Sequence, residues 1–364
     1  MDLQIINYTP DWSPAVVALN KRLVAGGMNP TLIFPETPRA EFPTDPNAAI
    51  HQEFFLAVEG DTVRGGYFMT HETWLIHGQP HRVSHYRLPL SESVIDRQYT
   101  YVSKAVMNHG LKRLPYVYCL GMGSYDLFPK RLAVLKWPMF SAAFLFHARR
   151  PAKVLRNLRS VRKNARKRLL LDLASYTGAG TVGMGLLQAM RHQSAPRATA
   201  NLVPEFGPWA DELLDRMKTV YPLLQRRGSE ALNTRYPQDD ARYIRLRIGD
   251  GWAVMLDTQM QDHLHFGDLR VGTIVDVFGP LEQARTIVQT AARHLADRGV
   301  DLIISNQTHA TWMDAFSQSG FLSGPSNYIF ACTPQLAETL NGPFEQTQKT
   351  LHITRGDGAG PIHL

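Results

Sequence analysis

Apolar positions in the first half of the chain alternate between two periods, one typical of β-strands and one typical of α-helices. Residues 53–90 form short apolar runs separated by turn residues at Gly60–Asp61 and at 76–81, which predicts an antiparallel meander. Helical spacing then takes over in residues 96–113. The predicted elements of this half are a strand at 3–8, a helix at 11–24, strands at 53–61, 63–76 and 81–90, a helix at 96–113, a strand at 116–122, a helix at 128–137 and a strand at 139–146.

The second half repeats this order of elements without a clear residue-by-residue repeat. Its predicted elements are a helix at 208–220, a hairpin at 242–259, a strand at 269–279, a helix at 281–299, a strand at 301–306, a helix at 309–320 and a strand at 327–334. The pattern therefore predicts an α/β (α+β) chain built by internal duplication. The predicted units are an N-terminal domain at 1–148, a basic connecting helix and Gly-rich junction at 149–200, a C-terminal domain at 201–340 and a tail at 341–364.

Charge and composition narrow the class of protein. The chain carries 39 Lys and Arg against 32 Asp and Glu, a formal +7, and residues 149–171 hold ten of the bases without an acid. Without that stretch the balance is 29 against 32, or −3. We expect no secretory signal at the N-terminus, and no apolar run reaches the roughly 18 residues of a membrane span. Cys119 and Cys332 lie in apolar contexts, so we expect buried free thiols and a cytoplasmic protein.

The basic stretch has two interpretations. Apolar residues recur along it every three to four positions, which predicts a helix with one packed seam and solvated cations: Val154, Leu158, Val161, Ala165 and Leu169. The cations of 149–168 are also suited to an anionic partner, either the backbone of tRNA or an anionic membrane surface. The stretch lacks aromatic residues for base stacking, so we expect no sequence readout and no DNA readout.

The order of elements, together with "SNQTHATWMDAFSQSGF" at 305–321, resembles the GCN5-related N-acetyltransferase (GNAT) superfamily, with Gly320-Phe321 at the family's Gly-Phe. The tandem copies resemble the double arrangement of Fem-type aminoacyltransferases. The resemblance implies two GNAT-like domains, each a mixed, mostly antiparallel twisted sheet flanked by helices. It also implies an acyltransferase that uses acetyl-CoA or another acyl-CoA to N-acylate an amino sugar, a peptide or a cell-envelope or polysaccharide precursor. A Fem-like enzyme would use aminoacyl-tRNA instead.

The loops that hold coenzyme A in this family depart from its pattern. The turns at 89–98 and 278–287 both lack the family's glycine pair, and Glu92 and Glu282 would place negative charge beside a pyrophosphate. If the second copy binds the cofactor, the resemblance places it on Gly279, Leu281, Glu282 and Gln283. The family's general-acid Tyr is replaced by Phe316 in the second copy and by Leu132 in the first. These departures keep open a non-catalytic binding or assembly module.

Four residues are candidates for catalysis: Asp276, His85, Asp257 and His265. Asp276 lies in the apolar run "TIVDVF", where a carboxylate needs either a partner such as Arg270 or a backbone amide, or a functional role. His85 lies on the corresponding strand of the first copy, and either His85 or its neighbour Tyr86 should face the cleft. Asp257 and His265, with His263 between them, can pair as acid and base or form a polar hairpin tip. No zinc-type spacing occurs, so we expect no metal. In the tail, Arg355 to Asp357 predict a tight turn.

Overall fold

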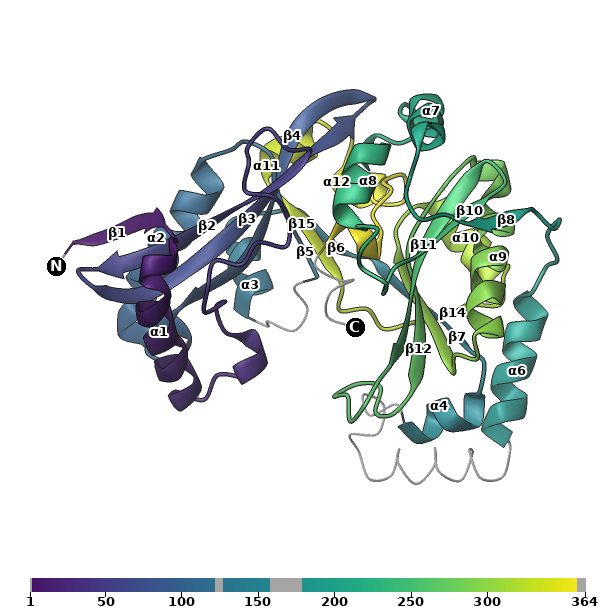
Figure 1. Ribbon diagram of the computed structural model, residues 1–364, viewed down its shortest axis with the longest axis horizontal. Helices are drawn as coiled ribbons and strands as arrows, with labels where there is room; N and C mark the ends of the chain where they lie inside the picture. Colours follow the sequence, from purple (N-terminus) through teal and green to yellow (C-terminus); the bar gives the residue numbers. More distant parts are fainter. Residues whose placement is uncertain (1, 122–126, 158–178, 359–364) are drawn as a thin grey trace.

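Two twisted sheets stand side by side in the computed structural model, which describes residues 2–121, 127–157 and 179–358 (Figure 1). The first sheet contains β1 (Leu3–Asn7), β2 (Ile50–Glu59), β3 (Thr62–Ile76), β4 (Gln79–Ser91), β5 (Val117–Leu120), β15 (Ile329–Cys332) and β6 (Met139–Ser141) in that order, with β9 (Leu223–Gln225) also paired to β3. The second contains β14 (Leu322–Gly324), β7 (Ala143–Ala148), β13 (Leu302–Gln307), β12 (Arg270–Phe278), β11 (Gly251–Gln259), β10 (Ile244–Ile248) and β8 (Ala200–Leu202). Both sheets are mixed and mostly antiparallel, which confirms the predicted fold class.

Helices cover both faces of each sheet. Those that pack on the first sheet are α1 (Ser13–Ala25), α2 (Thr100–Lys112), α3 (Leu127–Val134), α11 (Pro334–Glu338) and α12 (Phe344–Thr347). Those that pack on the second are α4 (Pro151–Asn157), α6 (Ala179–Arg191), α7 (Pro208–Met217), α8 (Ser229–Arg235), α9 (Ala284–Asp297) and α10 (Ala310–Ser317). Short 3₁₀ turns are η1 (Pro10–Trp12), η2 (Pro30–Leu32), η3 (Glu92–Val94), η4 (Arg97–Tyr99), η6 (Leu281–Gln283) and η7 (Arg355–Asp357). The apolar face predicted for α9 is the one it buries: Val288, Ala291 and Leu295 are fully enclosed. Each such side chain stabilises the fold by roughly 1–3 kcal/mol.

Each sheet contains at least one strand from the other half of the chain: β15 and β9 in the first sheet, and β7 in the second. The sequence predicts a single strand at 139–146, but the structure splits it at the buried Ala142 into β6, in the first sheet, and β7, in the second. β7 lies between β13 and β14, and β15 lies in the first sheet between β5 and β6. The predicted domain boundaries remain a prediction. A cut at residue 148 would remove β9 and β15 from the first sheet and β7 from the second.

The two sheets share a further feature, because each contains one pair of parallel strands that separates partway along. β4 and β5 are paired only at Ser84–Val117 and His85–Tyr118, and β12 and β13 only from Val271–Leu302 to Thr273–Ile304. A β-bulge follows in both cases, at Leu88–Pro89 in β4 and at Val275 in β12. We call the place beyond His85, where β4 and β5 separate, the first divergence. The place beyond Thr273, where β12 and β13 separate, is the second divergence.

The C-terminal segment, residues 351–357, is not a loose tail. Leu351, Ile353 and Thr354 are fully buried, and the segment forms isolated bridges with β9 and with Gln307 of β13. The predicted tight turn at Arg355–Asp357 is confirmed as η7, and the side chain of Thr354 caps it. In the basic stretch, only 149–157 is described, with α4 at its core; the predicted seam residues Leu158, Val161, Ala165 and Leu169 lie outside the described residues.

Candidate functional site

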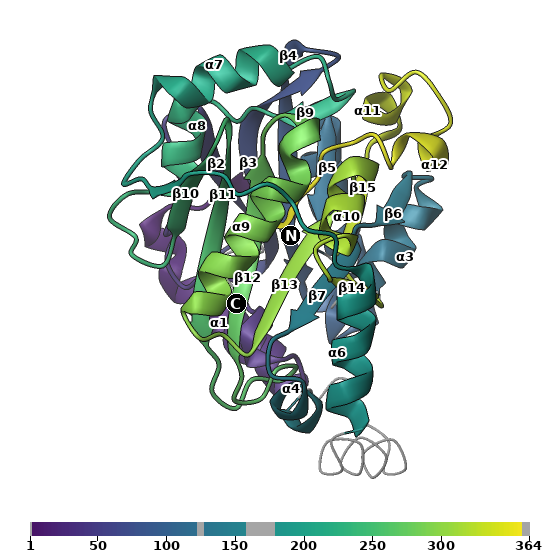
Figure 2. The same cartoon turned by 90° about the vertical axis from the view of Figure 1, so that its right-hand side faces the viewer.

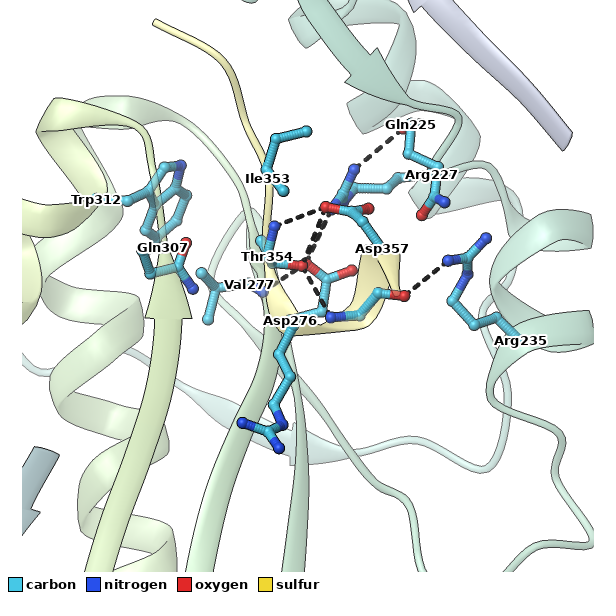
Figure 3. Close-up of polar contacts among 12 residues, drawn as sticks. Gln225, Arg227, Arg235, Asp276, Val277, Gln307, Trp312, Ile353, Thr354 and Asp357 are labelled. Atoms are coloured by element: carbon cyan, nitrogen blue, oxygen red, sulfur yellow. Dashed lines mark hydrogen bonds and ion pairs between the residues drawn. The ribbon is translucent and has the colours of Figure 1, made fainter. Parts of the chain in front are cut away.

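The C-terminal segment fills the second divergence. Thr308 of the loop after β13 accepts a hydrogen bond from the backbone of Ile353 at 3.0 Å, and its hydroxyl donates to the carbonyl of Leu351 at 2.6 Å. On the opposite side, the Thr354 hydroxyl donates to Asp276 Oδ1 of β12 at 2.9 Å. The segment therefore lies between the two strands whose pairing has ended, and its own backbone occupies the space between them (Figure 3).

Asp276 is held there by a buried guanidinium. Arg227 Nη2 lies 3.1 Å from Asp276 Oδ1 and 2.8 Å from Asp357 Oδ1, and all three side chains are at most 1% exposed (Figure 3). The predicted partner Arg270 was wrong, because Arg270 forms an ion pair with Asp257 at the other end of the hairpin. The predicted backbone amide is present, since the N–H of Val277 donates to Asp276 Oδ1 at 3.0 Å. Asp276 is thus a member of a network that fastens the C-terminal segment.

Two acids share one arginine in this network, and the second of them titrates abnormally. Burial raises the pKa of Asp357 and so does the nearby Asp276, while Arg227 opposes them, and the resulting pKa is about 6. The N–H of Thr354 also donates to Asp357 Oδ2 at 2.6 Å. Burial disfavours the charged guanidinium of Arg227, while Asp276 and Asp357 favour it, and its pKa is raised above the ordinary value. A buried ion cluster of this kind keeps its charges only while all partners are present.

A second cluster joins the two halves beside the first. Glu72 of β3 pairs with Arg235 of α8, and Tyr118 of β5 donates to Glu72 Oε1 at 2.6 Å. The carbonyl groups of η7 complete the cluster, because Arg235 donates to Gly356 at 2.7 Å and Tyr118 to Asp357 at 2.8 Å. Residues from β3, β5, α8 and the C-terminal segment thereby meet at one point.

A small pocket of about 20 Å³, enough for one water molecule, opens next to this point. It is lined by Glu41, Phe42, Thr70, Glu72, His85, Arg87, Arg235, Tyr243, Gly356, Asp357 and Gly358. The His85 ring stacks on Tyr118 with centroids 4.6 Å apart, at the last paired position before the first divergence. Arg87, two residues further along β4, donates to Glu41 at 2.6 Å. The pocket therefore lies at the first divergence, with the C-terminal segment as one wall.

The surroundings of the pocket histidine favour its neutral form. Burial lowers the pKa of His85 well below its ordinary value, and the charges of Arg87 and Arg235 lower it further. Its neighbour Tyr86 points to the opposite face, where its ring lies against Gly110 of α2. A neutral imidazole has a free lone pair, so His85 can accept a hydrogen bond from a group bound in the pocket.

The other sequence candidates lie elsewhere. Asp257 pairs with Arg270 at 2.7 Å and Arg298 at 2.8 Å, and His265 is exposed in the loop 260–269 that joins β11 to β12. β11 ends at Gln259, so His263 and His265 are not on a strand, and the polar hairpin tip is the observed structure. The structure thus brings His85 and Asp276 to adjoining clusters, and Asp257 and His265 to neither; a catalytic role for the last two stays a prediction.

Several residues of the site escaped the sequence analysis, notably Arg227, Arg235, Tyr118 and Glu72. Glu72 carries a weaker signal than Asp276, because it is a carboxylate in the strand-like segment "YFMTHETWLI" but has polar neighbours there. The arginines carry no such signal, because they lie in or next to short polar stretches of the second half. Only the fold brings them to the acids.

The predicted cofactor residues form a compact turn at the start of α9. Gly279 packs against Gly251 and Ile287, Gln283 donates to Asp250 Oδ2 at 2.9 Å, and Glu282 is exposed. The corresponding turn of the first sheet is closed by Glu92, which is 2% exposed and pairs with Arg22 and Arg64. Neither turn offers the glycine-lined amides that the family uses. Within the described ranges, no three His, Cys, Asp or Glu side chains gather as metal ligands would.

No protein-family model and no curated protein sequence matches the chain. Solved structures do match. A GCN5-related N-acetyltransferase from Anabaena variabilis aligns with 91% of this chain and 72% of its own at a TM-score of 0.51 and 11% identity. A probable N-acyltransferase from Enterococcus faecalis aligns with the same coverages and TM-score at 7% identity. The fold is the GNAT fold. A tandem GNAT protein from the clavulanic acid biosynthesis pathway also aligns, with 94% of this chain and 99% of its own, at a TM-score of 0.46 and 10% identity.

Proposed function

We propose that this protein is a GNAT-type acyltransferase that moves an acyl group from acyl-CoA to an amine, and that the first divergence is its active cleft. One observation carries the choice of cleft. The second divergence is filled by the C-terminal segment, whereas the first retains a pocket with a neutral histidine at its edge. An amine of an amino sugar, a peptide or a cell-envelope precursor is the proposed acceptor.

The reaction that fits this cleft needs a polarised carbonyl and a proton acceptor. A β-bulge takes a backbone amide out of the ladder, and Pro89 has no N–H, so Leu88 is the residue of the bulge that can donate to a thioester oxygen. The amine attacks the thioester carbon, His85 takes the proton that the amine loses, and the C–S bond breaks to release the CoA thiolate. Thiols have a pKa near 8.5, so this leaving group departs without a tyrosine acid.

The absence of the family's tyrosine is consistent with that scheme. Leu132 and Phe316, which stand at the tyrosine position of the two copies, are fully buried in apolar clusters. Tyr118 faces the pocket side of the sheet, but its hydroxyl already donates to Glu72 and to the carbonyl of Asp357. The proposed mechanism therefore relies on a base and on an amide, with no general acid from the chain.

The phosphates of the acyl-CoA donor need a contact other than the glycine-lined turn that the family uses. Glu92 holds the turn before α2 closed through Arg22 and Arg64, so the turn cannot wrap a pyrophosphate with its amides. Arg97 and Lys104 are exposed at and near the first turn of α2. We place the phosphates at these two cations, which supply charge in place of the missing amides.

Two measurements test the proposal. Calorimetric titration with acetyl-CoA and CoA should show binding, and Arg97→Gln with Lys104→Gln should weaken it about tenfold. In an acetyl-transfer assay on a panel of amino sugars and peptides, His85→Gln should lower kcat by about 100-fold or more while the Kd of acetyl-CoA stays constant. His192→Gln is the matched control, because this exposed histidine lies outside the pocket, and its activity should equal that of the wild type.

Other results would replace the proposal. Retention of aminoacyl-tRNA without binding of acetyl-CoA would favour a Fem-like transferase. Binding of neither donor would favour a non-catalytic GNAT-like module. The filled second divergence and the closed turn at Glu92 are the observations that support this rival.

A further inference from the structure

Helix α6 presents its apolar side chains to solvent and buries a polar one. Gln188 is 7% exposed, and its amide bonds to the backbone of Ala148 and to the ring of His147 on β7. On the outer side, Val182 is 70% exposed, Leu186 59%, Leu187 53% and Met190 75%. Surface helices normally have the opposite arrangement, with polar residues outward and apolar residues toward the core. A continuous exposed apolar face of this kind marks an interaction site.

Two glycines of α6, Gly183 and Gly185, are also exposed. A side chain added at Gly183 or Gly185 would meet no atom within 4 Å, so both positions are open. A glycine inside a helix costs about 1 kcal/mol relative to alanine, and here no packing contact offsets it. The exposed part of α6 therefore consists mainly of apolar side chains and glycines, and the helix has no acidic residue.

The segments before and after this face are rich in Lys and Arg. Between residues 149 and 200 the chain has 12 Lys and Arg and one acid, whereas the remainder has 27 against 31, or −4. Arg149 and Arg156 at α4, and Arg191 and Arg197 at and beyond the end of α6, are exposed. α4 packs against α6, and both lie at the same end of the molecule (Figure 2). Among the described residues, these four exposed arginines lie close in sequence to the apolar face of α6.

We propose that the outer face of α6 binds the surface of an anionic membrane, with the four arginines at the headgroups and the aliphatic side chains in the interfacial layer. Helices that lie in a membrane interface combine an apolar face with flanking Lys and Arg. No described helix is both long and apolar enough to cross a bilayer, so the contact is interfacial. A second copy of the chain fits this face poorly, because pairing would bring two basic corners together. The proposal does not rest on the acyltransferase function.

Vesicle co-sedimentation of the full-length protein tests the proposal. The wild type should bind vesicles of phosphatidylcholine mixed with phosphatidylglycerol and bind pure phosphatidylcholine far more weakly, and added salt should weaken the binding. Leu186→Glu with Met190→Glu should lower the affinity for the mixed vesicles about tenfold or more. Val134→Glu is the matched control: it changes another exposed aliphatic residue, 83% exposed on α3, and should leave binding unchanged.

A second pair of variants tests the charge. Arg191→Gln with Arg197→Gln should weaken binding and reduce its salt dependence, whereas Arg39→Gln with Arg216→Gln, which removes two exposed arginines elsewhere, should not. Absence of binding to the mixed vesicles, or equal binding by the Leu186→Glu, Met190→Glu variant, would overturn the proposal. So would a dimer that dissociates in that variant. A fall of its Tm by several degrees would overturn it too, since the chain itself would then cover the face.

Discussion

Arg227 is the residue on which the buried network depends. It is 1% exposed and forms ion pairs with two buried carboxylates, those of Asp276 and Asp357. Among the described residues, no hydrogen-bond partner lies near its Nε. The position of the guanidinium therefore favours its contacts with the two acids over a full set of hydrogen bonds. Since Asp276 and Asp357 lie on β12 and on the C-terminal segment, the charge of Arg227 is what allows these two elements to meet.

Arg227→Met keeps the length of the side chain and removes its charge. We expect the free energy of unfolding to fall by about 3–5 kcal/mol, because two buried carboxylates lose their counter-charge. Urea unfolding measures the change, with Arg242→Met as the control. Arg242 is 57% exposed in its pair with Asp240, so its loss should cost under about 1 kcal/mol. Replacing Asp276 and Asp357 by Asn in the Arg227→Met protein should recover part of the loss; a further loss would argue against this explanation.

Asp357 makes the stability of the protein depend on pH. Its pKa is raised from 3.8 to about 6, so the folded state holds a proton that the unfolded state has already released. This contribution is fully present below pH 3.8 and is lost as the pH rises through about 6. Between pH 5 and 7 it amounts to about 1 kcal/mol. Raising the pH from 5 to 7 should therefore lower the free energy of unfolding of the wild type by about 1 kcal/mol relative to that of Asp357→Asn. Equal pH profiles for the two proteins would contradict the assignment.

At the scale of elements, the helices and turns that follow from local periodicity could be predicted from the sequence. The helices α2 and α9 follow from apolar spacing, and the turn at η7 follows from Arg355 to Asp357. The division between β6 and β7 does not, because both halves of "MFSAAFLF" have the same apolar character. Which sheet a strand joins depends on partners that lie more than 150 residues away, such as the pairing of β7 with β13.

The candidate site was only partly predictable for the same reason. His85 and Asp276 were found because a titratable side chain interrupts an apolar strand. The partner of Asp276 was missed because the nearest arginine along the strand, Arg270, belongs to Asp257, whereas Arg227 lies 49 residues away. The C-terminal segment was interpreted as a tail because its glycines and charges resemble a solvated end, and its burial depends on Arg227 and Arg235.

At the scale of the whole molecule, the exchange of β7 and β15 makes the two halves depend on one another. Without β15, β5 and β6 would each expose an unpaired edge, and Phe330, Ala331 and Cys332, all fully buried in the intact chain, would be missing from the core. Without β7, β13 and β14 would be left apart in the same way. Exposed edges of apolar strands promote aggregation. The Glu72–Arg235 pair adds a buried ionic contact between the halves.

The intact chain should therefore unfold in a single transition, although it has two sheets. We expect its calorimetric enthalpy to equal its van't Hoff enthalpy, with the same midpoint by circular dichroism and by tryptophan fluorescence. Residues 1–148 and 149–364, produced separately, should each aggregate or lack a cooperative transition, and co-expression should restore soluble protein as a complex of the two. A fragment 1–148 that is monomeric and unfolds cooperatively would show that the first sheet closes without β15, and the halves would then be independent domains.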